Sequence, residues 1–345
     1  MLNAIPVSEP RESPCVWVAN GAASVREALA DPLLRVRPID EPIPLAIAGT
    51  PAGDLFARLC RQNDGPRHDA LRAILMTALR NGEGTALDHA ARRRTGRLIA
   101  ASPARDGALL DRLAREVPST ALAALLDLPE AETMADDVGA LVAGFAPAPT
   151  DDAIVAASAA AVRLTERVAA VWPGDDDLHA NLVGVFTQAF DATAGLIGAT
   201  LLALAARPQL ARVAADDVAL TQRVVRETAR WDPSVLSTRR FAAADTTLGD
   251  YRVRTGDTVI VMLAAANRDP AANRRPDTFD PDRPAPVSFT FGDGAHACLG
   301  EHLAVTIATA VVRRVLTAGV DIASATAAPR YRGEPNLHIP VFGAP

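Results

Sequence analysis

The sequence predicts a mainly helical single domain with a small β region late in the chain. Hydrophobic residues make up 49% of the 345 residues and aromatic residues only 4%, so the core is built from Ala, Leu and Val. Alanine and leucine favour helices because they lose little entropy on entering them. Apolar residues recur at helical spacing over residues 24–231, and short β-type runs follow Pro233. We expect residues 1–345 to form one domain, with residues 1–15 as an extended or disordered lead.

The early helices are predicted from apolar spacing of three and four residues, over SVREALAD and residues 67–80, 86–99 and 151–172. Residues 177–206 have the longest helical pattern, and at 1.5 Å per residue this helix would span about 45 Å. It is apolar almost all round and should therefore be buried. Arg207 and Pro208 end it, and one more helix is expected over residues 216–231, where acidic residues suit an N-terminus.

After Pro233, the runs STRRFA, TTLGDYRV and DTVIVML are typical of short strands joined by Gly-Asp turns. A proline-rich coil follows, and then a last long helix over about residues 299–317. The chain is expected to end in a hairpin near residues 337–341.

Charge and cysteine content exclude several classes of protein. The formal net charge of −6 is spread along the chain, which argues against nucleic acid or an anionic membrane as a partner. Cys15, Cys60 and Cys298 are far apart and form no CxxC pair, so neither a disulfide framework nor a structural zinc site is expected. The first residues do not have the pattern of a signal peptide, and we expect a cytoplasmic location.

The strongest motif is FGDGAHACLG, residues 291–300. Two glycines make a tight loop, Cys298 follows, and a long helix begins. Backbone N–H groups and the positive end of that helix would favour the thiolate. A dinucleotide GxGxxG motif would need glycine where Ala297 stands, and zinc would need further clustered ligands. A buried structural cysteine is the remaining alternative for the residue taken alone.

This motif resembles the cysteine-ligand signature FGxGxHxCLG of the cytochrome P450 family, with every fixed position filled. The resemblance implies haem b as cofactor, with Cys298 as the metal ligand and Phe291 and Gly300 as cofactor-binding residues. The haem would lie between the long central helix and the cysteine loop. A thiolate ligand donates electron density to haem iron and so favours O–O cleavage.

Other family motifs occur in the expected order. Glu227 and Arg230 in RETARW match the ExxR pair, which Arg283 in FDPDR would complete in a buried structural network. His68 and Arg72 match HxxxR. Arg240 matches RxAxxD, and His296 lies within the cysteine loop. The resemblance implies that the two haem propionates are bound by His68, Arg72, Arg240 and His296. AAANRDP is a further match, and the resemblance covers about residues 16–341.

The long helix departs from the family pattern AGxETT or AGxDTT. Gln188, Asp191, Ala192 and Thr193 are the expected catalytic residues, with Asp191 at the acidic position and Ala192 where a threonine normally helps deliver protons during oxygen activation. Four alternatives remain: a substrate hydroxyl with ordered water, Gln188 or Thr193 acting through water, peroxide as the oxidant, or a register shift that lets Thr193 serve directly.

The chain is also short for the family, with a compressed stretch over residues 151–191 that would reduce the lid of the substrate pocket. The resemblance implies a monooxygenase that oxidises a small organic substrate in secondary metabolism. Ferredoxin and ferredoxin reductase would supply electrons, and residues 235–238 and 336–338 would line the pocket. Two alternatives stay open: a peroxide-using or other non-monooxygenase reaction, and a haem-binding sensor or carrier without turnover.

Overall fold

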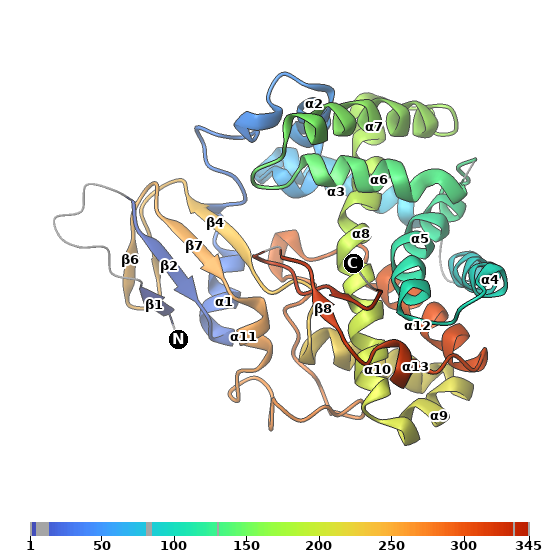
Figure 1. The fold of residues 1–345 in the computed structure, drawn as a ribbon. Coiled ribbons are helices and arrows are strands. Elements are labelled where there is room, and N and C mark those ends of the chain that lie inside the picture. The colour runs from blue at the N-terminus through green and yellow to red at the C-terminus, as the bar shows by residue number, and fades with distance from the viewer. Residues whose placement is uncertain (1, 5–13, 81–84, 130, 334, 344–345) are drawn as a thin grey trace.

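The fold is mainly helical, with a small sheet at one edge of a large helical body (Figure 1). The computed structural model describes residues 2–4, 14–80, 85–129, 131–333 and 335–343. The predicted fold class is confirmed in this part of the chain. Leu2–Ala4 of the expected lead forms a strand, and residues 5–13 lie outside the described residues.

The elements follow one another in chain order. The α-helices are α1 (Ala22–Ala30), α2 (Pro51–Arg58), α3 (Gly65–Arg80), α4 (Thr85–Ala101), α5 (Gly107–Leu125), α6 (Met134–Gly144), α7 (Asp151–Ala169), α8 (Asp176–Ala205), α9 (Pro208–Asp216), α10 (Val218–Trp231), α11 (Leu263–Asn267), α12 (Glu301–Thr317) and α13 (Ile322–Ala325). Short 3₁₀ helices are η1 (Leu45–Ile47), η2 (Cys60–Gln62), η3 (Ala131–Thr133) and η4 (Gly294–His296). The strands are β1 (Leu2–Ala4), β2 (Val16–Ala19), β3 (Leu34–Arg35), β4 (Thr238–Ala242), β5 (Thr246–Leu248), β6 (Tyr251–Val253), β7 (Thr258–Val261), β8 (Arg330–Tyr331) and β9 (Pro340–Val341).

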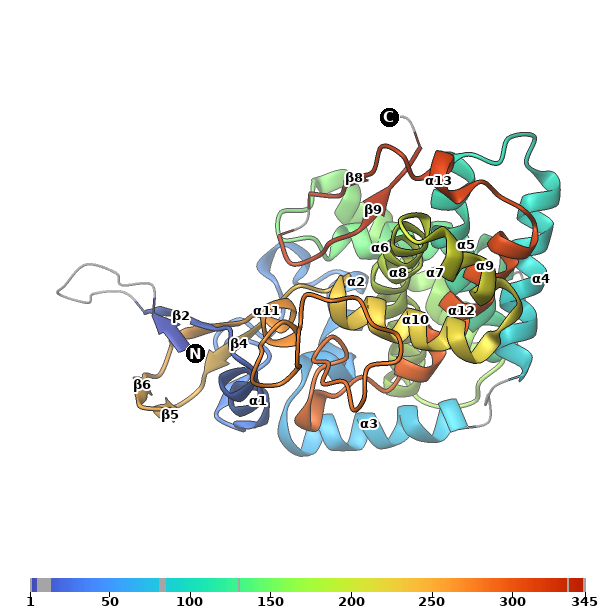
Figure 2. The same cartoon turned by 90° about the horizontal axis from the view of Figure 1, so that it is seen from below.

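Helix α8 is the predicted long helix, and it runs through the helical body (Figures 1 and 2). The side chain of Asp175 caps its N-terminus by accepting a hydrogen bond from the backbone N–H of Leu178. Helices α5, α6, α7, α10 and α12 all pack against it. By length and composition α8 could cross a membrane, but 67% of its most apolar window is buried inside the fold, as in a helix of a protein core.

The main sheet has five strands in the order β1-β2-β7-β4-β3, with β2 parallel to β7 and the other pairs antiparallel. Buried Asp257 joins β2 to the turn before β7, because its carboxylate accepts the backbone N–H of Cys15 at 2.7 Å and the indole N–H of Trp17 at 2.8 Å. The sheet and α1 bury a small core separate from the helical one. This arrangement fixes β4, which carries Arg240.

Several helix ends differ from the predicted ones. The helix expected over residues 216–231 is α10, which begins at Val218 because the Asp217 side chain caps it by accepting the N–H of Leu220; α9, which ends at Asp216, was not predicted. Helix α7 ends at Ala169 rather than at residue 172, since Trp172 instead donates its indole N–H to the carbonyl of Leu126. Helix α12 begins at Glu301, and Cys298 stays in the loop before it.

The predicted C-terminal hairpin is present, and its first strand begins earlier than the predicted range. We define the C-terminal hairpin as residues 330–343, in which β8 pairs antiparallel with β9. Its tip is fastened to the chain after α10 by the N–H of Leu236 to the carbonyl of Asn336 at 2.9 Å, and by the N–H of His338 to the carbonyl of Ser234 at 2.8 Å. The segments predicted to line a pocket therefore lie together.

Candidate active site

The cysteine loop is a tight turn that presents Cys298 just before α12. Gly292 and Gly294 have φ angles of +72° and +67°, a conformation that side chains with a Cβ rarely adopt. The backbone N–H of Cys298 donates to the carbonyl of Phe291 at 2.8 Å and closes the turn. The Gly300 N–H then donates to the Cys298 Sγ at 3.3 Å. The loop thus directs a backbone donor at the sulfur, as the motif predicts.

The Cys298 side chain has accessible surface, and yet the protein around it desolvates the thiol. Burial raises the pKa of this thiol, against the Gly300 hydrogen bond and the charges of Arg72 and Arg61, which lower it. Arg61 and Arg72 lie close enough to the thiol for their charges to act on it, and Arg61 also acts on Arg240. We call this site the cysteine recess and define it by Arg61, His68, Arg72, Arg240, His296 and Cys298.

Helix α3 brings His68 and Arg72 to the cysteine loop, because residues four apart share a helix face. The rings of His68 and His296 have centroids 4.2 Å apart. Arg72 Nη1 donates to the carbonyl of Ala297 at 2.8 Å. His296 Nε2 lies 3.1 Å from Asp64 Oδ1. The predicted His-x-x-x-Arg pair and the loop histidine are therefore neighbours.

Arg240 extends from β4 and is only 4% exposed. Its Nη1 donates to the backbone carbonyl of Arg239 at 2.9 Å, and no carboxylate of the described residues lies within 4.0 Å of its guanidinium. Burial lowers its pKa to about 10, and Asp64 offsets this at longer range. The pKa of Arg61 in η2 is also lowered by desolvation, and the negative charge of a Cys298 thiolate offsets part of this shift. The recess has more cationic than anionic groups.

The predicted Glu-x-x-Arg network is buried and connected. Arg230 is fully buried and donates from Nε and Nη2 to the two carboxylate oxygens of Glu227 at 2.9 and 2.7 Å. Arg230 also donates to the carbonyls of Asn267, Pro276 and Thr278. Arg283 joins it, with Nε 3.5 Å from Glu227 Oε1. This network fastens α10 to the coil that precedes the cysteine loop.

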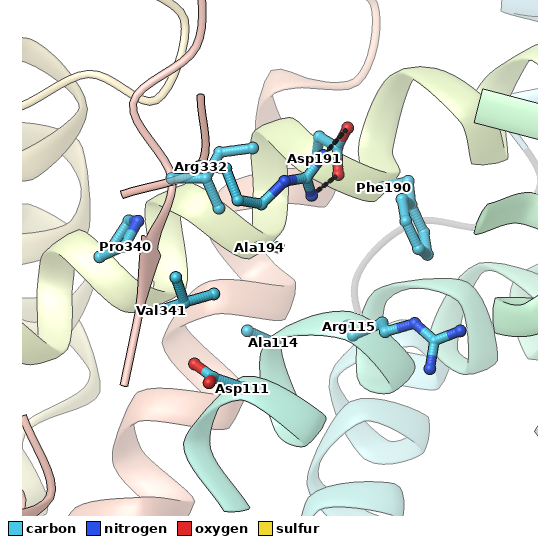
Figure 3. A pocket seen from close by; sticks show the side chains of 10 residues that line it. Asp111, Ala114, Arg115, Phe190, Asp191, Ala194, Arg332, Pro340 and Val341 are labelled. Carbon is cyan, nitrogen blue, oxygen red and sulfur yellow. Dashed lines mark hydrogen bonds and ion pairs between the residues drawn. The ribbon is translucent and has the colours of Figure 1, made fainter. Parts of the chain in front are cut away.

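The predicted catalytic residues of α8 have separate surroundings. Asp191 is 8% exposed and forms a bidentate pair with Arg332, at 2.6 and 3.1 Å (Figure 3). The Gln188 amide donates to the carbonyl of Gly184, one turn back. Ala192 is half-buried and Thr193 is buried. Among the described residues, Asp191 and Gln188 thus bond to different partners.

Comparison with known proteins identifies the chain. The model of the family described as Cytochrome P450 matches residues 173–318. Protein AknT of Streptomyces galilaeus is 32% identical over 373 aligned positions, which cover 95% of this chain and 82% of AknT. The chain belongs to the cytochrome P450 family.

Curated relatives that are named as P450 proteins match over shorter lengths. The Cytochrome P450 family protein EryCII of Saccharopolyspora erythraea is 34% identical, over 50% of this chain and 47% of EryCII. Several of the curated relatives are thus matched over less than half of their length. The crystal structure of CalO2 matches with a TM-score of 0.81 at 23% identity, over 98% of this chain and 93% of CalO2, which shows the shared P450 fold.

The cofactor of the P450 family is haem b, and the cysteine recess fits it. Buried Arg240 lacks a carboxylate within ion-pair distance among the described residues, so a carboxylate group entering the recess would meet a guanidinium already desolvated for it. Cys298 is accessible from the same recess and has its N–H donor in place. Haem has both features that these residues match: an iron for the sulfur and two propionates for the cations.

Three residues of the P450 site were not predicted from the sequence: Arg61, Asp64 and Arg332. No motif marks Arg61, which lies in a short 3₁₀ turn. Asp64 precedes the Gly-Pro start of α3, and an acidic residue four positions before His68 was the one available signal. Arg332 contacts Asp191 across 141 positions of sequence, a distance that no local pattern spans.

Proposed function

We propose that this chain is a haem-thiolate monooxygenase of the P450 family that oxidises a small organic substrate. One observation carries the proposal: the Cys298 thiol, with the Gly300 N–H donating to it, shares a recess with the buried guanidinium of Arg240. Haem, when bound, supplies the iron at which the oxidant is activated. We further propose that His68, Arg72, Arg240 and His296 hold the propionates, while Phe291 and Gly300 border the porphyrin.

In the proposed monooxygenase, other residues act on the sulfur, on the His296 ring and on the proton path. Gly300 stabilises negative charge on the sulfur through its N–H, and this tunes electron donation by the thiolate. Asp64 holds the His296 ring by a hydrogen bond at 3.1 Å and so sets which ring nitrogen faces the recess. Asp191 is the proposed residue of the proton path on α8, and Arg332 orients its carboxylate through two hydrogen bonds.

Ala192 changes the proton path of a monooxygenase reaction, because it stands where the family has a threonine hydroxyl. It offers no hydroxyl, so we propose that water held by Gln188 or Thr193, or by a hydroxyl of the substrate, carries protons from Asp191. Secondary metabolism, a cytoplasmic location, and ferredoxin with ferredoxin reductase as the electron source belong to the same proposal. Peroxide as oxidant is the second candidate function, and the alanine favours it because peroxide already carries the protons that dioxygen lacks.

The two oxidants can be separated by one assay. A compound library is first screened for ligands that change the spin state of the haem protein. With such a ligand, we expect product with ferredoxin, ferredoxin reductase and NAD(P)H, and less with hydrogen peroxide alone. Product with peroxide only would replace the monooxygenase by the peroxide-using enzyme. A library without any spin-state change would favour the sensor or carrier.

Replacing Arg240 with leucine tests the proposed propionate partner. A charge-assisted hydrogen bond contributes about 1.5–3 kcal/mol, so we expect haem affinity to fall about 10- to 100-fold. The measurement is the rate of haem loss to an excess of apomyoglobin. Arg239→Leu is the matched control, because Arg239 is the neighbouring residue of β4 and is exposed. Equal haem loss from the two variants would remove Arg240 from the propionate site.

A further inference from the structure

A second cavity lies between α5, α8 and the C-terminal hairpin (Figure 3). Its volume is about 240 Å³. Ala114 of α5 and Ala194 of α8 face it, with Phe190, and the hairpin contributes Ile339 and Val341. Small residues on both helices leave the space open, and the surface is mostly apolar. The pocket is partly open to solvent, and its apolar walls offer contact to the body of a small apolar molecule.

This cavity is separate from the cysteine recess. Successive residues of a helix are about 100° apart, so Phe190 and Ala194 lie roughly opposite Gln188 and Ala192 on α8. None of the six residues that define the cysteine recess lines the cavity. Asp191 lies between the two faces, where its carboxylate pairs with Arg332 at the cavity wall.

The charged residues at the cavity are two carboxylates, Asp111 and Asp191, and two arginines, Arg115 and Arg332, and Arg332 pairs with Asp191. Asp111 Oδ1 accepts the N–H of Phe342 at 2.9 Å, and Oδ2 accepts the N–H of Gly343 at 2.8 Å; a carboxylate of this kind has room for a further donor. Pro118 inside α5 has no N–H, so the carbonyl of Ala114 lacks its usual donor from one turn ahead. The guanidinium of Arg115 points away from Asp111 and Val341 (Figure 3). It pairs with Asp136 at 2.7 Å.

We propose that this cavity is a second binding site, for a small and mostly apolar molecule that carries a hydroxyl group. The apolar walls of Phe190, Ala194 and Val341 would surround the body of the molecule. Its hydroxyl would donate to Asp111 or to the carbonyl of Ala114. The site does not depend on haem, so its test is independent of the proposed function.

The probe is 4-bromophenol, because the anomalous signal of bromine locates it directly in a crystal of the full chain. We expect a bromine peak between α5 and α8, and saturable binding in equilibrium dialysis. 4-Bromoanisole has the same body without the donor, and we expect it to bind about tenfold more weakly. Bromine found only beside Cys298, or nowhere, would overturn the proposal.

Filling the cavity provides the matched protein control. Ala194→Phe places a ring in the space from α8, and Val341→Phe does so from the hairpin; either variant is used if its thermal midpoint stays near that of the wild type. Each is expected to weaken 4-bromophenol binding at least tenfold. Undiminished binding by a folded variant would contradict a site in this cavity.

Discussion

Replacing Cys298 with serine is expected to abolish the far-shifted Soret absorbance that sulfur ligation gives to the reduced, carbon monoxide-bound haem protein. Serine removes the sulfur and keeps the size and the neighbouring N–H of Gly300. A serine hydroxyl stays protonated under conditions where the thiol can ionise, so it is a poor ligand for iron. The expected result is a complete loss of the thiolate spectrum, together with loss of any oxidation product.

Cys15→Ser is the control for this variant. Cys15 is buried in the sheet region, with its backbone N–H held by Asp257, and it does not line the cysteine recess. Its serine variant should keep the wild-type spectrum. A Cys298→Ser protein with an unchanged spectrum would show that another residue holds the iron, and the proposed function would fail with it.

Replacing Glu227 with alanine is expected to lower the free energy of unfolding by about 3–5 kcal/mol. The change leaves the guanidinium of Arg230, which is fully buried, without its carboxylate. It also removes the acceptor of the backbone N–H of Asp280, which lies 2.9 Å from Glu227 Oε1. An uncompensated buried charge is costly because neither water nor another anion replaces the lost partner. Urea unfolding followed by circular dichroism measures the effect.

An exposed pair of the same type provides the comparison. Asp88 and Arg92 of α4 form an i,i+4 ion pair at 2.9 Å, partly open to water. Asp88→Ala should cost less than about 1 kcal/mol, because water screens such pairs. A Glu227→Ala protein that is as stable as Asp88→Ala would show that the buried network does not hold α10 to the coil before the cysteine loop.

The sequence by itself determined the helical fold, the long α8 and the motifs that identify the family. These features are local: apolar spacing along one helix, glycines at positive φ around Cys298, and Glu227 three residues before Arg230. Each follows from the backbone geometry of a few residues that are close in the sequence. The helix ends were less accurate because capping by Asp217 depends on one side chain.

Only the tertiary structure decided which partners those residues have. Asp191 was predicted to belong to the proton path, and the structure adds a partner for its carboxylate, Arg332 of the C-terminal hairpin. No motif marks Arg61 of the cysteine recess or Asp64, the partner of His296, and the cavity beside Ala194 exists because an alanine of α5 faces it. Such contacts join segments that are far apart in the sequence. They depend on how the packed helices are oriented around α8, which local spacing does not encode.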